Sequence, residues 1–107
     1  MVELQYSIVL VNLNPTVGSE IKKTRPCLII SPDEMNRHLN TVIVAPLTST
    51  TKPYPSRTHV VHKGKKGMIA LDQIRTIDKA RIIKEYSTIT KSNIKRVKSV
   101  LKEMLID

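Results

Sequence analysis

Arg25 is the side chain of this sequence that is best suited to bind a phosphate. It precedes Pro26 and the apolar run CLII (27–30), which is typical of a β-strand. Proline has no backbone N–H and favours an extended conformation in the residue before it, so we expect Arg25 at the start of this strand. A guanidinium is a planar, permanently charged donor that can bind two phosphate oxygens at once. The sequence therefore predicts an anion-binding arginine at a strand end.

The net charge of the chain also favours an anionic partner. Lys and Arg number 18 against 9 Asp and Glu, which gives a charge of +9. Nucleic acid, an anionic membrane or an acidic protein would suit this excess, and a solvated basic surface explains it equally well. The chain has no Phe or Trp and 3 Tyr, too few for a row of aromatic rings that stack bases. We expect phosphates and base edges, with Tyr54, to carry any contact with nucleic acid.

Disulfide and metal chemistry have no support in the sequence. The single Cys27 excludes an internal disulfide, and no Cys/His cluster has the spacing of a zinc site. His59 and His62 are three apart in an expected strand, so their side chains should point to opposite faces. No segment is long and apolar enough for a membrane span. We expect a cytoplasmic protein without a metal or other cofactor and without a membrane partner.

Short apolar segments separated by turns predict a mainly β fold. Ser31, Pro32 and Glu34 are typical of a helix start, with Ser31 as the cap and Pro32 at the first helical position. This helix must be short because strand character resumes at Thr41. The basic turn 63–66 suggests that two strands form a hairpin. Strands are expected at 8–13, 26–30, 41–45, 58–61, 67–71 and 81–86.

The C-terminal segment changes to a helical period. Its apolar stripe consists of Ile94, Val97, Val100, Leu101, Met104 and Leu105, and a second stripe consists of Lys91, Lys95, Lys98 and Lys102. A solvated face is the simpler explanation of the lysines, and an anionic partner is the alternative. The whole pattern predicts one domain over residues 1–107. We expect an α+β protein, mainly β: a small barrel of twisted antiparallel strands with a short inserted helix and a C-terminal helix.

Four sequence blocks occur in order along the chain: PTVGSE (15–20), TRPCLIIS (24–31), VAPLTS (44–49) and LDQIRTID (71–78). In this combination, the chain resembles the MazF/PemK toxins of bacterial type II toxin–antitoxin modules. The resemblance runs from about residue 8 to residue 81, with a compatible C-terminal helix beyond. It implies an SH3-like barrel, a homodimer, and an antitoxin partner whose acidic C-terminal tail occupies the RNA groove. It also implies a metal-independent, sequence-selective endoribonuclease (an mRNA interferase) that cleaves single-stranded RNA.

The resemblance assigns catalytic residues position by position. Arg25 matches the arginine of the R-P block, Thr48 matches the threonine of the second catalytic block, and Glu20 matches an acidic position near the active site of some members. The expected reaction is attack of a 2′-hydroxyl on the scissile phosphate, which yields a 2′,3′-cyclic phosphate and a 5′-hydroxyl. Arg25 and Thr48 would stabilise the charge that develops on the phosphate oxygens, since an arginine is a poor base. RNA contacts are expected from Ser19, Ser49, Thr50, Lys52, Tyr54, Asp72 and Gln73.

The group that accepts the 2′-hydroxyl proton stays open. Glu20 and Asp72 are the first candidates, followed by His59. Asp72 matches an aspartate that transfers a proton in some relatives beside an arginine two residues earlier, but this chain has Ala70 there. An ion pair with Arg75 or a turn-capping role explains Asp72 equally well.

Two other functions are also open. CcdB-like toxins use the same barrel to poison DNA gyrase through a C-terminal tripeptide that contains Trp, whereas this chain has no Trp and ends in Leu-Ile-Asp. A catalytically inactive RNA-binding regulator is the second alternative. It is suggested by Ala70 and by Tyr6-Ser7, which stands where the family usually has Gly-Asp.

Overall fold

Seven strands and two α-helices follow one another along the residues that the computed structural model describes, which are 4–13, 24–50, 52 and 54–106. The strands are β1 (Ser7–Asn12), β2 (Thr24–Ile29), β3 (Thr41–Thr48), β4 (Arg57–His62), β5 (Lys65–Ala70), β6 (Arg75–Asp78) and β7 (Ile82–Thr88). The helices are α1 (Asp33–His38) and α2 (Lys91–Leu105), and two short 3₁₀ helices are η1 (Leu71–Gln73) and η2 (Lys79–Arg81).

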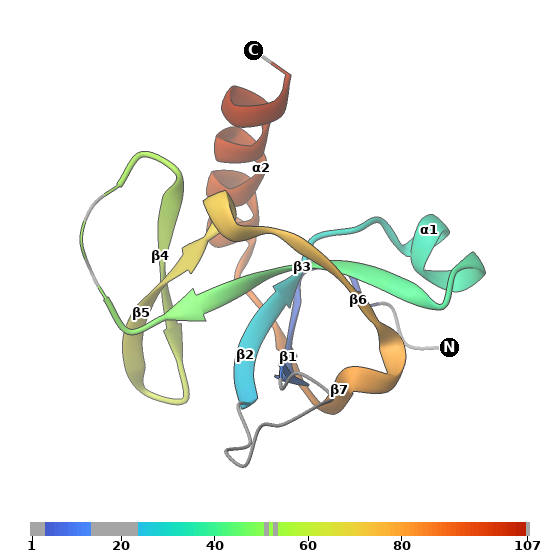
Figure 1. Ribbon diagram of the computed structural model, residues 1–107. Helices are drawn as coiled ribbons and strands as arrows, with labels where there is room; N and C mark the ends of the chain where they lie inside the picture. The colour runs from blue at the N-terminus through green and yellow to red at the C-terminus, as the bar shows by residue number, and fades with distance from the viewer. Residues whose placement is uncertain (1–3, 14–23, 51, 53, 107) are drawn as a thin grey trace.

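The strand pairings of the described residues are all antiparallel. Their order is β4-β5-β3-β2-β1-β7, and β6 also pairs with β3. The sheet twists and curls into a half-barrel, with α1 inserted between β2 and β3 (Figure 1). This architecture confirms the predicted fold class of twisted antiparallel strands with a short inserted helix and a C-terminal helix.

The long strand β3 connects the two parts of the sheet. Its first half pairs with β6, from Thr41 to Val44, and its end pairs with β5 at Leu47 and Thr48. Pro46 lies where the neighbour changes from β6 to β5. A proline costs the sheet little at such a point, because its missing N–H interrupts neither ladder.

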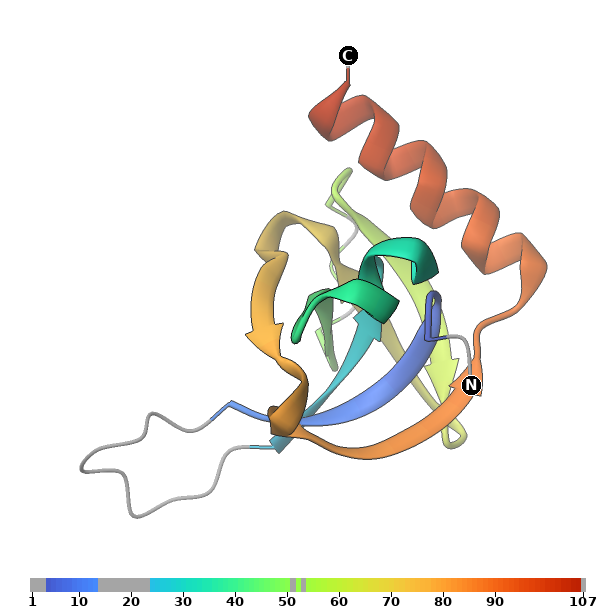
Figure 2. The same ribbon diagram turned by 90° about the vertical axis from the view of Figure 1, so that its right-hand side faces the viewer.

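Successive residues of the strands point to opposite faces and pack into two different apolar clusters. Ile8 and Leu28 belong to one cluster, whereas Val9 and Cys27 belong to the other. Helix α2 lies along β4 and covers the first cluster, where Val97 is fully buried (Figure 2). The apolar stripe of α2 packs against the core in its first part, but Met104 and Leu105 are exposed. No helix of the described residues is both long and apolar enough to span a membrane.

Two details differ from the sequence-based expectations. Ser31 does not cap α1: Pro32 is the N-cap residue, with no hydrogen bond from a side chain. The buried Ser31 hydroxyl instead donates to Asn36 Oδ1 and accepts the Ile43 N–H at 3.0 Å, which ties α1 to β3. The predicted hairpin is confirmed and is tighter than the 63–66 turn, because Lys63 and Gly64 both adopt positive φ and β5 already begins at Lys65.

Candidate active site

The ends of four strands meet at one edge of the sheet. β2 begins and β3 ends there, and the β4–β5 hairpin reaches the same edge because adjacent strands are antiparallel. A cleft of about 290 Å³ opens between these ends. The polar and charged side chains in its described lining are Thr24, Arg25, Thr48, Ser49, His62, Lys65 and Lys66.

Arg25 and Thr48 are brought together by the register of β2 and β3. In this ladder Cys27 lies opposite Pro46. The ladder ends at this pair, so Arg25 and Thr48 each lie two residues beyond it, at the same end of the two strands and on the same face. Both residues line the cleft. The predicted catalytic pair therefore occupies one site.

Arg25 is available to an anion in this cleft. It is exposed near the start of β2, as the sequence predicted. Among the described residues, no carboxylate lines the cleft, and none forms an ion pair with Arg25. Lys65 and Lys66 add two positive charges to the same lining. The described lining of the cleft is therefore basic, which favours an anion.

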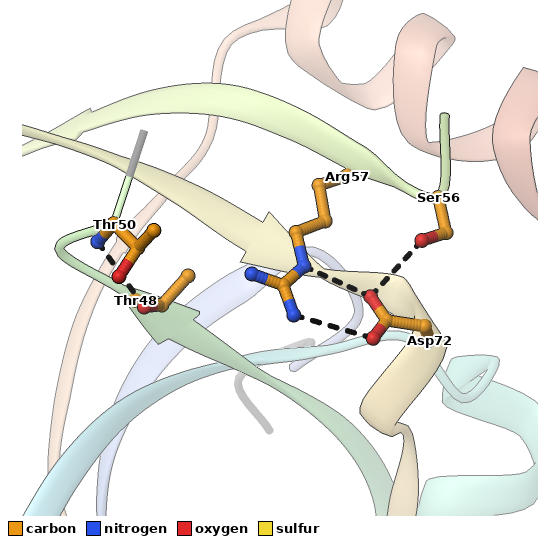
Figure 3. A network of polar contacts seen from close by, with 5 residues as sticks. All are labelled: Thr48, Thr50, Ser56, Arg57 and Asp72. Atoms are coloured by element: carbon orange, nitrogen blue, oxygen red, sulfur yellow. Dashed lines mark hydrogen bonds and ion pairs between the residues drawn. The ribbon is translucent and has the colours of Figure 1, made fainter. Parts of the chain in front are cut away.

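Thr48 is fixed at the end of β3 by a local hydrogen bond. Its Oγ1 accepts the Thr50 N–H at 3.2 Å (Figure 3). The hydroxyl oxygen is the acceptor in this bond, so its hydrogen can still be donated to a phosphate oxygen. Ser49 lies in the lining beside it.

Asp72 belongs to a second polar cluster, formed by η1 and the start of β4. Its carboxylate accepts two bonds from Arg57, at 3.1 and 3.3 Å, and one from the Ser56 hydroxyl at 3.1 Å (Figure 3). The ion-pair partner of Asp72 is therefore Arg57, and the alternative of a pair with Arg75 is wrong. The reason is the hairpin register, which pairs Arg57 with Ala70 and so brings it close to Asp72.

This second cluster also holds Tyr54. The Arg57 guanidinium carbon lies 4.8 Å from the centroid of the Tyr54 ring. The hydrogen bond from Arg57 is the main cause that lowers the pKa of Asp72, and the same bond raises the pKa of Arg57. A carboxylate held in this way is a poor proton acceptor. Its bonds to Ser56 and Arg57 suit a structural role, in which Asp72 of η1 holds the start of β4 and the residue before it in place.

The remaining predicted site residues do not line the Arg25 cleft in the part of the chain that the structure describes. Lys52, Tyr54 and Gln73 are exposed, outside the described lining of the Arg25 cleft. His59 lines a different cleft, together with Arg96. Ser19 and Glu20 lie outside the described residues.

Sequence reasoning missed three titratable residues of the cleft: His62, Lys65 and Lys66. Burial is the main cause that lowers the pKa of His62, and the Lys63 charge adds to the effect. The signal in the sequence was the basic run 63–66 directly after a strand, which was interpreted only as a turn. Knowing that the hairpin reaches the start of β2 would have identified these residues.

Cys27 lies behind Arg25 and takes no part in nucleophilic chemistry. The side chain is 1% exposed, and burial raises the pKa of its thiol to about 11 despite the nearby charges of Arg25 and Arg75. It is a small core residue. Within the described ranges, no group of three or more His, Cys, Asp or Glu side chains could hold a metal ion.

Comparison with known proteins gives consistent matches over nearly the whole chain. Residues 4–105 match the family described as PemK-like, MazF-like toxin of type II toxin–antitoxin system. An Endoribonuclease MazF from Staphylococcus epidermidis is 35% identical over 100 residues, which cover 88% of this chain and 83% of that protein.

Two solved structures illustrate the similarity of fold. The MazE-MazF crystal structure (Form-III) from Deinococcus radiodurans has a TM-score of 0.79 at 26% identity, and the match covers 94% of each chain. An endoribonuclease in complex with its cognate antitoxin from a mycobacterial species has a TM-score of 0.80 at 22% identity, covering 95% of this chain and 93% of that one.

Proposed function

This chain belongs to the PemK-like, MazF-like toxins of type II toxin–antitoxin systems and is an endoribonuclease of that family, and we propose that it cleaves single-stranded RNA by attack of a 2′-hydroxyl on the adjacent phosphate. The P–O5′ bond breaks in this reaction, which leaves a 2′,3′-cyclic phosphate and a 5′-hydroxyl. The observation that carries the proposal is that Arg25 and Thr48 line the same basic cleft, at the edge where β2 begins and β3 ends.

Arg25 and Thr48 supply the donors that this reaction needs. Negative charge grows on the non-bridging phosphate oxygens in the transition state, and preorganised donors stabilise it. Arg25 can donate two hydrogen bonds, and the Thr48 hydroxyl is held in place by the Thr50 N–H. Lys65 and Lys66 contribute further positive charge. This charge can substitute for that of a metal ion, so we propose a metal-independent reaction.

The proton of the 2′-hydroxyl needs an acceptor, and the leaving 5′-oxygen needs a donor. Glu20 is our first candidate for the acceptor because of its position beside the active site in some relatives. Asp72 is a poor acceptor because its hydrogen bonds with Arg57 and Ser56 lower the pKa of its carboxyl group. His62 is the second candidate, since its ring lines the same cleft as Arg25.

Sequence selectivity is proposed to come from the loops around the cleft. Side chains there can read the edges of unstacked bases. The proposed contact residues are Ser19, Ser49, Thr50, Lys52, Tyr54, Asp72 and Gln73.

The proposed partners follow from charge and from the family. A basic cleft also suits the acidic C-terminal tail of a cognate antitoxin, which would block RNA by occupying the same place. The solved relatives described as MazE-MazF and as a complex with a cognate antitoxin support this partner. We further propose a single-domain protein that acts as a homodimer in the cytoplasm.

The proposal is tested with purified protein and a long single-stranded RNA in the presence of EDTA. Primer extension maps the cut sites, and end analysis identifies the terminal groups. We expect cuts at one short motif, with 2′,3′-cyclic phosphate and 5′-hydroxyl ends. No cleavage of any RNA, or cleavage that stops when metal is chelated, would contradict the proposal. Trapping of DNA gyrase without RNA cleavage would favour the CcdB-like alternative.

A further inference from the structure

A second and larger cleft lies beside the candidate active site. It has a volume of about 560 Å³ and opens between β4 and β7, next to the start of α2. These two strands end the strand order of the sheet, so the cleft is the seam where the half-barrel stays open. Val60 and His62 line both this cleft and the Arg25 cleft. The two clefts therefore adjoin at these residues.

Tyr86 is the aromatic residue that this seam offers to a ligand. It is partly buried and lines the cleft from β7. The His62 ring meets it edge-on, with centroids 4.8 Å apart and an interplanar angle of 72°. The Nζ atoms of Lys63 and Lys84 lie 5.1 and 5.4 Å from the Tyr86 centroid. The seam thus combines one flat ring with two ammonium groups.

This combination has the chemistry of a nucleotide site. Proteins hold single-stranded nucleic acid by stacking bases on aromatic rings while lysines follow the phosphates. Lysine side chains are flexible and can turn from the ring toward a phosphate oxygen. Glu85, which is also in the lining, can accept a hydrogen bond from an amino group of a base. A volume of this size is typical of small-molecule sites.

We infer that the seam between β4 and β7 is a subsite for a nucleotide near the scissile phosphate, with its base on Tyr86 and its phosphate on Lys63 and Lys84. This inference rests on the proposed function, because it extends the RNA path from the Arg25 cleft. It follows that the RNA contact reaches past the nucleotides at the cut. The shared wall at His62 favours RNA over an unrelated peptide as the occupant.

Binding of an RNA that cannot be cleaved tests this inference apart from catalysis. The probe is a fluorescein-labelled, mixed-sequence single-stranded RNA in which every 2′-hydroxyl is methylated, and the readout is fluorescence anisotropy. We expect Tyr86→Leu to weaken binding about tenfold and Tyr86→Phe to bind like the wild type, since stacking needs a ring but no hydroxyl. Equal binding by the wild type and Tyr86→Leu would overturn the inference. So would a Tyr86→Leu variant that loses affinity for an acidic peptide and keeps its affinity for the RNA.

The lysines provide a second measurement that does not depend on core packing. Each of Lys63→Gln and Lys84→Gln should reduce the slope of log affinity against log salt by about 0.7, the value for one phosphate contact on a single strand. Lys102→Gln, in the last turn of α2, is the matched control and should leave the slope unchanged. Slopes that change equally in all three variants would show a diffuse charge effect and would also overturn the inference. The proposed function is tested separately: it fails if the wild-type protein does not cleave unmodified RNA, whatever the binding measurements show.

Discussion

Gly67 lies directly against the backbone carbonyl of Thr48. A Cβ atom on Gly67 would be 2.6 Å from the Thr48 oxygen, closer than Cβ atoms approach in real structures. Met68, the next residue of β5, pairs with Thr48. A glycine is therefore needed for β5 to pack against the end of β3, and this contact sets the position of Thr48 in the cleft.

Gly67→Ala should reduce both stability and activity. The methyl group must push β5 away from the end of β3, at a cost of about 1–3 kcal/mol of unfolding free energy, as for other overpacked sites. Urea unfolding measures the loss of stability, and cleavage of RNA measures the displacement of Thr48.

Gly64→Asn is the matched control for this variant. Gly64 has φ of +77° and nothing within 4 Å of an added Cβ, and asparagine tolerates this conformation. We expect near wild-type stability and activity for Gly64→Asn. Equal losses in the two variants would contradict the role of the Gly67 contact.

Asp72→Asn should remove a stabilisation that depends on pH. The bond from Arg57 lowers the pKa of Asp72 in the folded protein from its usual 3.8. The stabilisation is therefore fully present above this usual value and is lost as the pH falls through the folded-state pKa. The difference in unfolding free energy between wild type and Asp72→Asn, measured at a series of pH values, should shrink on acidification. A difference that is constant over this range would contradict the ion pair.

Protonation of His62 should lower the free energy of unfolding in mild acid. Burial and Lys63 lower its pKa in the folded protein, so the unfolded chain takes up a proton near its usual pKa of 6.5 before the folded protein does. Stability is thus unaffected above this value and falls as the pH drops toward the folded-state pKa. In His62→Gln, thermal unfolding at a series of pH values should lose this part of the acid sensitivity. If His62→Gln has the same pH dependence of stability as the wild type, the lowered pKa of His62 is contradicted.

Cys27 should resist thiol reagents in the folded protein. Its burial and a pKa of about 11 leave little thiolate near neutral pH. We expect slow reaction with Ellman's reagent under native conditions and fast reaction in urea. Rapid modification of the folded protein would contradict the burial of this side chain.

Much of the fold could be predicted from the sequence because the strands carry β-branched apolar residues between clear turns. Strand β6 was missed, since only Ile77 is buried in its four residues and no periodicity can emerge from one position. Ser31 was misinterpreted because its hydroxyl could either cap α1 or form hydrogen bonds with residues further along the chain. Only the tertiary structure shows that Asn36 and Ile43 take it.

The site could be predicted only in part. Arg25 and Thr48 were identified from motifs, and the β2–β3 register then explains why they meet. The ion pair of Asp72 with Arg57 depends on the hairpin register, and no local pattern encodes it. The contribution of the β4–β5 hairpin to the cleft is likewise a property of how the sheet curls.

The cleavage rate of Arg25 variants tests the central claim most directly. We predict that Arg25→Ala lowers the single-turnover rate about 10²–10³-fold, as expected for the loss of a donor to the transition state. Arg25→Lys should fall between this variant and the wild type, because it keeps the charge and loses the paired hydrogen bonds. Arg37→Ala, on the exposed side of α1, is the control and should cleave at the wild-type rate. A loss below about tenfold in Arg25→Ala, with the fold intact by circular dichroism, would contradict the account.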